Sequence, residues 1–464
     1  MPSAGPGGAA SPAAKGAALP PEPDVSGRKM VVAGACLLGS TFVPYVQAIV
    51  GPLMMLPMIK EFGWTRTEYA FATTFFFLFG SITVLLFGRI ADRFGVRPIL
   101  LAGAVFGGAT MILLSFQTAA LWRLYATYAL LGAFGSSGVG YTKVIGALFT
   151  KHRGKALAIF GAESTVALAV LPILTNTLIG HLGWRGTYVA FGLVMFLVVP
   201  VIYFLVHEPG RRMRGAASAA SPRSPPVLQG MTPAQIRKDR VFWLIVLTAV
   251  LGGGLHSGLM THVVAAITDK GFSPTVAAGV LSVATLLGLS GSLAGGFAVD
   301  HFRKARVLCM FALLSAAGMV LFALASASFG GLALLIAAMA MQVSANAATR
   351  PISTYLQTRY FGLRAFAEAN AIQIVFQGIA MAITPPLFGL IYERTGSYAP
   401  VYWILVGGGV VAAMVYLLLG PYRFGADIGS AGGPGAPPGA AGADPPLASG
   451  PPLQDLLDGA ANAG

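Results

Sequence analysis

The chain has 464 residues, of which 56% are apolar and only 10% are charged, whereas soluble domains carry about 25% charged residues. Its mean hydropathy is +0.75, and the apolar residues lie in long blocks. A soluble fold of this length cannot bury so much apolar surface, so the composition predicts an integral membrane protein. Sixty glycines without a three-residue period exclude collagen. Two cysteines, far apart in apolar blocks, give neither a disulfide framework nor a metal-ligand spacing.

A net charge of +14 and a pI near 10 raise the question of a nucleic-acid partner. The basic residues sit in short clusters between apolar blocks, however, which is the pattern of loops in membrane proteins. No basic module interleaved with aromatic residues is present. We therefore expect a lipid bilayer, and no nucleic acid, as the chain's surroundings.

Apolar runs long enough to cross the hydrocarbon core need about 20 residues each. Twelve such runs occur, at 30–57, 69–88, 97–116, 121–147, 155–179, 187–206, 241–265, 275–299, 305–325, 331–355, 366–391 and 400–420. Continuous runs of this length predict helices, because strands of a membrane barrel alternate over about 10 residues. The expected fold is an all-α integral membrane protein with twelve transmembrane helices in two pseudo-symmetric six-helix bundles.

The polar segments divide the chain into five expected regions. They are a disordered cytoplasmic tail at 1–29, a six-helix bundle at 30–206, a cytoplasmic basic linker at 207–240, a second bundle at 241–420, and a disordered cytoplasmic tail at 421–464.

The distribution of basic residues predicts the orientation. With the N-terminus inside, the tails and loops on that side carry 22 of the 30 Lys and Arg residues, and the opposite loops carry six. Lys143 and Arg350 lie within predicted helices. The positive-inside rule then places both termini in the cytoplasm of a multi-pass protein, which we expect in the cytoplasmic (bacterial inner) membrane.

A polar motif occurs twice, between the second and third helices of each half. The first copy contains Gly88, Asp92, Arg93, Gly95 and Arg97, and the second contains Gly296, Asp300 and Arg303. Glycines permit a tight turn, and the aspartate can accept from helix N-terminal amides or pair with the arginines. Ordinary basic loops are the alternative, but two copies in register favour a conformational switch in a repeated transporter architecture.

Both loops resemble the G-x-x-x-D-R-x-G-x-R motif of the major facilitator superfamily, and the six-plus-six plan is similar too. Within it, segments such as Glu61–Arg66, Gly183–Arg185 and Asp269–Gly271 resemble the monocarboxylate and oxalate/formate group. The resemblance implies alternating access about a midplane site. Tyr128 stands where proton-coupled members commonly carry an arginine, four residues before a glycine, and Gly288 and Ser292 stand where relatives carry charged residues in the eighth helix. Neither the group's best-known substrates nor its coupling mode therefore carries over.

Three charged residues within predicted helices are candidates for function, because an ionisable side chain in hydrocarbon is costly. Glu163, eight residues into the fifth helix, is the expected carrier of a coupling proton, with a structural carboxyl as the alternative. Arg350 and Lys143 occupy corresponding places in the two halves, where they would compensate a substrate carboxylate. Snorkelling to the interface is the alternative, above all for Lys143.

Neutral polar residues extend the candidate set. His256, near the centre of the seventh helix, is an expected proton relay, or else a neutral histidine bonded to a facing helix. Gln47, Gln373 and Gln377 offer hydrogen bonds to a substrate, or serve as contacts between helices. Tyr128 joins the expected substrate-binding set, with packing as the alternative.

The function expected from these residues is secondary transport of a small organic anion, a mono- or dicarboxylate, with protons as possible coupling ions. Efflux of apolar or cationic compounds is one alternative, since a lone buried acid suits a cation. A non-transporting membrane sensor on the same fold is the other. We expect a monomer that is not an enzyme and has no cofactor or metal. No nucleotide is implied, because the chain has no phosphate-binding loop.

Overall fold

The computed structural model describes residues 27–43, 46–149, 153–206, 230–301, 305–328 and 330–424. Most of the expected tails, 1–26 and 425–464, and most of the expected linker, 207–229, lie outside these ranges. So do the side chains of some helical residues, among them 153–166, Asp92, Asp300 and Arg350.

The described chain is helical and contains no strand, apart from one isolated bridge between Gly230 and Gly362. The helices of the first half are α1 (Gly27–Phe42), α2 (Val46–Phe62), α3 (Arg66–Phe94), α4 (Arg97–Ser115), α5 (Leu121–Gly135), α6 (Gly138–Leu148) and α7 (Arg153–Leu205). Those of the second half are α9 (Pro233–Lys238), α10 (Arg240–Ala249), the π-helix η1 (Val250–Gly254), α11 (Leu255–Asp269), α12 (Pro274–His301), the 3₁₀ turn η2 (Ala305–Leu308), α13 (Cys309–Leu324), α14 (Gly331–Phe361), α15 (Phe366–Thr395) and α16 (Ala399–Leu418).

Each of the twelve expected apolar runs coincides with helix, which confirms the all-α membrane fold. The expected helices at 155–179 and 187–206 both lie in α7, which is kinked between them at Gly183, where the backbone is not helical (φ 66°). The run at 241–265 contains the π-helix η1, so that α10 and α11 continue through it. Within the described residues, nine segments are long and apolar enough to span a membrane, and α13 is a shorter apolar helix.

The helices carry large apolar side chains on their outer faces. On α7, Leu193, Leu197 and Phe204 are 53%, 70% and 67% exposed, and their spacing places them on one side of the helix. In water such a stripe would be an aggregation hazard, whereas in a bilayer it contacts lipid. The exposed residues therefore support the membrane environment that the composition predicts.

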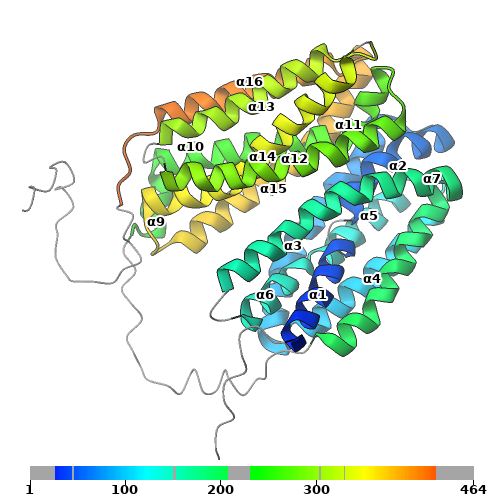
Figure 1. Ribbon diagram of the computed structural model, residues 1–464, viewed down its shortest axis with the longest axis horizontal. Coiled ribbons are helices and arrows are strands. Elements are labelled where there is room, and N and C mark those ends of the chain that lie inside the picture. The colour runs from blue at the N-terminus through cyan, green and yellow to red at the C-terminus, as the bar shows by residue number, and fades with distance from the viewer. Residues whose placement is uncertain are drawn as a thin grey trace, which may run out of the picture. The chain divides into compact units, whose positions relative to one another are not determined.

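The two halves repeat one packing arrangement, and Figure 1 shows α1–α7 (blue to green) and α10–α16 (green to orange) each gathered into a bundle. In the first half α5 packs on α3 so closely that a Cβ on Gly132 would lie 2.0 Å from Phe76 O. In the second half α12 packs on α14, and a Cβ on Gly291 would lie 2.2 Å from Ser344 O. Glycine is required at both positions because two backbones meet there.

Helix pairs also join the two halves, through α3 with α15, α7 with α12 and α2 with α11. We call the end of the molecule at the α2–α3, α11–α12 and α15–α16 connections the distal end, and the opposite end the proximal end. At the proximal end the last residues of the expected linker are ordered. Thr232 caps α9 through a capping box with Gln235, and Met231 N donates to Phe361 O at 2.8 Å.

Asp239 connects this ordered segment to the end of α16. Its carboxylate accepts from Val241 N at 2.8 Å, which caps α10, and it forms an ion pair with Arg423. Burial opposes the ionisation of Asp239. Its hydrogen bonds to the Arg423 guanidinium and the Val241 amide outweigh that effect and lower the pKa of Asp239 below its ordinary value.

Removing this contact should destabilise the protein in a pH-dependent way. Asp239→Ala, which loses both cap and ion pair, should lower the free energy of unfolding by about 1 kcal/mol. Asp239→Asn keeps a capping side chain and should cost less. Because the folded pKa is depressed, the charge-dependent part of the difference from wild type is present at pH 7 and is lost as the pH falls below about 4 and through the folded pKa. Melting temperatures of the detergent-solubilised protein at both pH values check this, and a pH-independent difference would contradict it.

Candidate functional site

A cluster of buried polar side chains lies inside the first half, where α2, α3, α5 and α7 meet. Gln47, Tyr69, Tyr128 and Tyr188 are between 0% and 5% exposed. Tyr69 Oη donates to Gly51 O at 2.7 Å and lies 2.7 Å from Tyr128 Oη. The two tyrosine rings meet edge to face, with centroids 6.2 Å apart. The structure thus brings together two expected site residues, Gln47 and Tyr128, and adds two tyrosines that the sequence analysis missed.

The direction of the hydrogen bonds in this cluster follows from what each group can do. A carbonyl only accepts, so the single proton of Tyr69 goes to Gly51 O, and Tyr128 donates to Tyr69. Both polar atoms of the Gln47 amide and Tyr188 Oη are buried and form no hydrogen bond within the described residues, although both side chains lie close enough to Tyr128 to interact with it electrostatically. The cluster therefore ends in an amide and a hydroxyl that interact with their neighbours but have hydrogen-bonding capacity left over.

A second polar region lies in the other half, around the π-helix η1. Single-turn π-helices often occur at functional sites. A Cβ on Gly253 would lie 2.1 Å from Gln377 Nε2, so the glycine lets α15 approach η1 closely. Two residues beyond η1, His256 Nδ1 is buried and has no hydrogen-bond partner within the described residues. The structure thus places His256 and Gln377 on helices that meet at this irregular segment.

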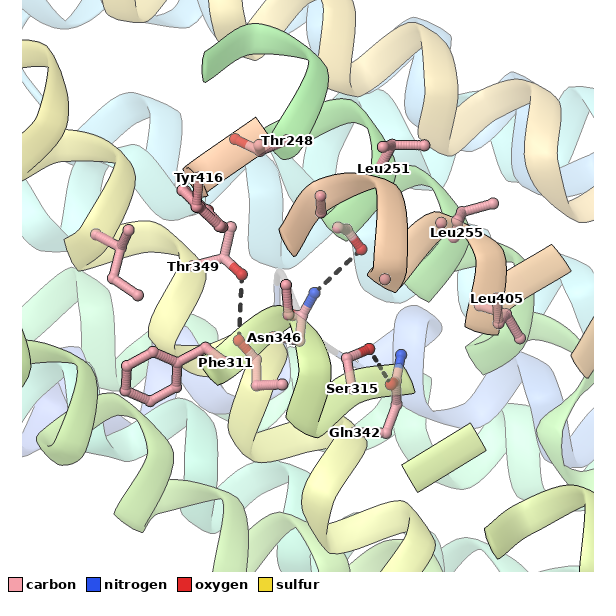
Figure 2. Close-up of a pocket in the computed structure, with 17 residues that line it drawn as sticks. Thr248, Leu251, Leu255, Phe311, Ser315, Gln342, Asn346, Thr349, Leu405 and Tyr416 are labelled. Carbon is pink, nitrogen blue, oxygen red and sulfur yellow. Dashed lines mark hydrogen bonds between the residues drawn. The ribbon is translucent and has the colours of Figure 1, made fainter. Parts of the chain in front are cut away.

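A small cavity of about 50 Å³ borders the same π-helix and lies among α10, α11, α13, α14 and α16. Figure 2 shows Ser315 donating to Gln342, at 2.5 Å, and Asn346 pointing at the backbone of η1, where it donates to Gly252 O at 3.3 Å. A cavity measured in this way needs a volume of about 10–15 Å³ to hold one water molecule. The cavity is large enough for water, and its mostly apolar lining includes the polar side chains of Ser315, Gln342 and Asn346. Asn346 lies one helical turn before Arg350 on α14.

Gln373 occupies a different environment from the other glutamines. Its Oε1 accepts from Ser353 Oγ at 2.7 Å and from Gln357 Nε2 at 2.5 Å. These bonds connect α14 to α15 within the second half. They agree with the alternative interpretation of Gln373, a contact between helices. A substrate role for Gln373 stays a prediction.

The charged candidates are placed less fully. The side chains of Glu163, on α7, and Arg350, on α14, lie outside the described part. Lys143 lies half-buried on α6. The expected roles of these three residues stay predictions.

The repeated loop motif forms the proximal ends of α3 and α12. Gly95 caps α3 with φ 97°, a backbone region that only glycine adopts readily, while Gly88, Asp92 and Arg93 lie in the last two turns. Arg97 begins α4, donates to Tyr203 O and stacks over the Tyr203 ring, with its Cζ 4.5 Å from the centroid. In the second copy Gly296 lies in α12, while the Asp300 side chain and Arg303 lie outside the described residues.

An ion pair joins the two halves at the distal end. Arg66, at the start of α3, donates to both carboxylate oxygens of Asp269 on α11, at 2.6 and 2.9 Å. The Arg66 guanidinium also stacks on the ring of Tyr392 on α15, with its Cζ 3.8 Å from the centroid. Beside it Thr67 N donates to Glu393 Oε1 at 2.9 Å. We call Arg66, Asp269, Tyr392 and Glu393 the distal latch.

A buried histidine, His262, lies next to the distal latch and contacts Tyr398. His262 Nε2 lies 2.8 Å from Pro385 O, and Nδ1 lies 2.8 Å from Tyr398 Oη. Since a carbonyl only accepts, Nε2 carries the proton and Nδ1 accepts from the tyrosine. His262 therefore holds Tyr398 in place, with the centroid of its ring 5.2 Å from Cζ of Arg66.

Comparison with known proteins identifies the family. The profile of the Major Facilitator Superfamily matches residues 36–341 and 266–448. The chain belongs to the Major Facilitator Superfamily. Among solved superfamily structures, the D-xylose-proton symporter superposes with a TM-score of 0.68 at 17% identity, over 85% of this chain and 98% of that chain. The expected all-α transporter fold is thereby confirmed, and the chain is a secondary transporter rather than an enzyme.

Several relatives in sequence are named monocarboxylate transporters. Monocarboxylate transporter 4 of Mus musculus is 24% identical over 374 residues, which cover 79% of this chain and 77% of the relative. Monocarboxylate transporter 11 of Homo sapiens is 26% identical, over 71% of this chain and 70% of the relative. The resemblance to the monocarboxylate group is thus confirmed.

Loosening the distal latch should open the distal end. Spin labels at Trp122 and Arg394, exposed at the distal ends of α5 and α15, report the separation of the halves in a background with Cys36 and Cys309 replaced by alanine. Asp269→Asn should raise the ratio of open to closed molecules about two- to fivefold, as for a partly exposed ion pair.

The matched control is Glu61→Gln. It removes the ion pair with Arg185, which is 2.6 Å long, lies at the same end and stays within the first half. This variant should leave the distances between the labels unchanged. Equal shifts in both variants, or none in Asp269→Asn, would contradict the role of the latch.

Proposed function

We propose that this superfamily member transports a small organic anion, most specifically a monocarboxylate, by alternating access of its two halves. One observation carries the proposal: the buried cluster of Gln47, Tyr69, Tyr128 and Tyr188 ends in an amide and a hydroxyl that have no partner within the described residues. The relatives that are named monocarboxylate transporters support the same substrate class.

The chemistry of the cluster suits a carboxylate. Hydroxyl and amide N–H groups donate strong hydrogen bonds to a charged oxygen. In a site without water, such a bond contributes more to the binding energy than a hydrogen bond between two neutral groups. A carboxylate also needs a positive charge to offset its loss of hydration. We propose Arg350 and Lys143, at corresponding places of the two halves, for this role. Arg350 would bind the carboxylate through a bidentate contact.

Protons are the coupling ion that the remaining groups favour. We propose Glu163 as the residue that takes up and releases the coupling proton, and His256, beside the π-helix, as a relay. A buried carboxyl that alternates between wet and dry surroundings changes its proton affinity, which links its protonation to the conformation. Symport of proton and anion would move a neutral pair, which lowers the electrostatic cost of crossing the membrane.

The proposed orientation rests on charge. The basic excess lies on the loops of the proximal end and predicts a cytoplasmic location for both termini, in a bacterial inner membrane. In that orientation the distal latch faces the exterior.

Uptake by proteoliposomes tests the substrate class. The purified protein should accumulate radiolabelled pyruvate or lactate but not the neutral analogue lactamide. Tyr188→Phe and Gln47→Leu should each raise KM about tenfold or more, because each removes a hydrogen bond to a charged group. Arg350→Ala should abolish uptake.

Tyr203→Phe is the matched control for the tyrosine variant. Its hydroxyl is removed from a half-exposed ring, and KM should not change. Undiminished uptake by Tyr188→Phe and Arg350→Ala together would refute the proposed site. Transport of a lipophilic cation in place of the anion, dependent on Glu163, would instead support the efflux alternative.

An imposed pH gradient tests proton coupling. An acidic exterior should drive accumulation of the anion in wild type. Glu163→Gln should lose this accumulation yet retain counterflow exchange, because exchange of the loaded carrier needs no net proton release. Unchanged stimulation by the gradient in Glu163→Gln would remove the residue from the coupling mechanism, whatever the substrate.

A further inference from the structure

The adjacent prolines of α15 leave two backbone carbonyls without a helix partner. In an α-helix the amide of residue i bonds the carbonyl of residue i−4, and proline has no amide hydrogen. Pro385 therefore leaves Met381 O unpaired within the helix, and Pro386 leaves Ala382 O unpaired. In a dry membrane interior such a carbonyl must find another donor.

Each of the two carbonyls receives a hydroxyl from a different helix. Ser257 Oγ, on α11 of the same half, donates to Met381 O at 3.2 Å. Thr74 Oγ1, on α3 of the other half, donates to Ala382 O at 2.5 Å. The carbonyl freed by Pro385 thus accepts a hydrogen bond within its own bundle, and the carbonyl freed by Pro386 accepts one from the other bundle.

The bond between bundles lies in the middle of a seam of small residues. Thr67, Thr74 and Ser81 recur every seven residues on α3, so they share one face. Opposite them on α15, a Cβ on Gly389 would lie 2.8 Å from Thr67 Cα, and a Cβ on Gly378 would lie 3.2 Å from Ser81 Oγ. The two helices are close enough along this length for the Thr74 hydroxyl to reach the carbonyl directly.

We propose that Pro386 and Thr74 form a hydrogen-bonded catch that positions the two halves during transport. Pro386 exposes Ala382 O, and Thr74 binds it only while α3 and α15 touch. When the halves separate, α15 itself offers no amide N–H to Ala382 O, because Pro386 has none. Water or a bound solute must then donate in place of Thr74. Opening of the seam is therefore tied to entry of water at the middle of the membrane.

A double-mutant cycle separates this role from a simple proline kink. The spin labels at Trp122 and Arg394 measure the ratio of open to closed molecules in the cysteine-replaced protein. Thr74→Val should raise this ratio about three- to tenfold, the range for loss of one hydrogen bond. In the Pro386→Ala background the new amide bonds Ala382 O, so Thr74→Val should change the ratio less than about twofold.

Three control variants accompany the cycle. Thr73→Val removes a hydroxyl that bonds Ala70 O within α3 and should leave the ratio unchanged. Ser257→Ala removes the bond to the other orphan carbonyl, within one bundle, and should also leave it unchanged. Thr74→Ser keeps the donor and should behave as wild type.

Two results would overturn the proposal. The first is an equal effect of Thr74→Val in both backgrounds, which would mean that the proline acts through the shape of α15. The second is a shift in Ser257→Ala as large as that in Thr74→Val. If Thr74→Val does not fold, Thr74→Ala provides the same cycle, with hydrogen exchange of α3 and α15 as the readout. The proposal does not depend on the substrate, so it can fail or hold independently of anion transport.

Discussion

The structure depends on one constraint, that polar groups within a bilayer must find their partners inside the protein. Water is absent there, so every amide, carbonyl and hydroxyl that the helices do not use internally becomes a contact point. Helix-borne threonines satisfy this alone, as Thr261 does by donating to Ser257 O at 3.0 Å. The carbonyls that Pro385 and Pro386 release cannot do so, and they fix where α11 and α3 pack on α15.

The same constraint separates the charges from the hydrocarbon. Ion pairs of the described residues lie at the ends of helices, and the two ends use them differently. At the distal end, Arg66 and Asp269 connect the halves, while Glu61 and Arg185 pair within the first half. At the proximal end, Asp239 pairs with Arg423 and Arg237 with Glu368, both within the second half. Contacts between halves that include the distal latch and the Thr74 bond to Ala382 describe a conformation that is closed on the distal side.

Much of the fold could be predicted from the sequence because the relevant signals are local. Apolar runs of sufficient length indicate spanning helices, and the repeated Gly–Asp motif indicates two related halves. Gln47 and Tyr128 also carry a local signal, as polar residues in apolar runs, and the structure brings them together. Tyr69 and Tyr188 carry the same signal, but tyrosine is common in packing, so nothing in the sequence distinguishes them from other buried rings.

Contacts between distant parts of the chain could not be predicted in this way. Arg66 and Asp269 are separated by 203 residues, and in the sequence each is an ordinary charged residue near a loop. Only the packing of the two halves brings them together. The proline pair is visible in the sequence and predicts orphan carbonyls, but not which helix supplies the donor. Gln373 shows the converse, since its expected substrate-binding amide accepts from Ser353 and Gln357 of the neighbouring helix.

The two halves share a frame, yet they carry different polar features. Close contacts at Gly132 and Gly291 hold corresponding helix pairs together within each half. Within this frame the first half holds the tyrosine cluster, and the second holds the π-helix and its small cavity. Gln47, Tyr188 and His256 all carry buried polar atoms that lack a hydrogen bond within the described residues. A buried polar group without a hydrogen bond is costly, and a ligand or water that completes its bonds stabilises the state that binds it. Differential stabilisation of this kind is what allows substrate binding to change the conformation of a two-state transporter.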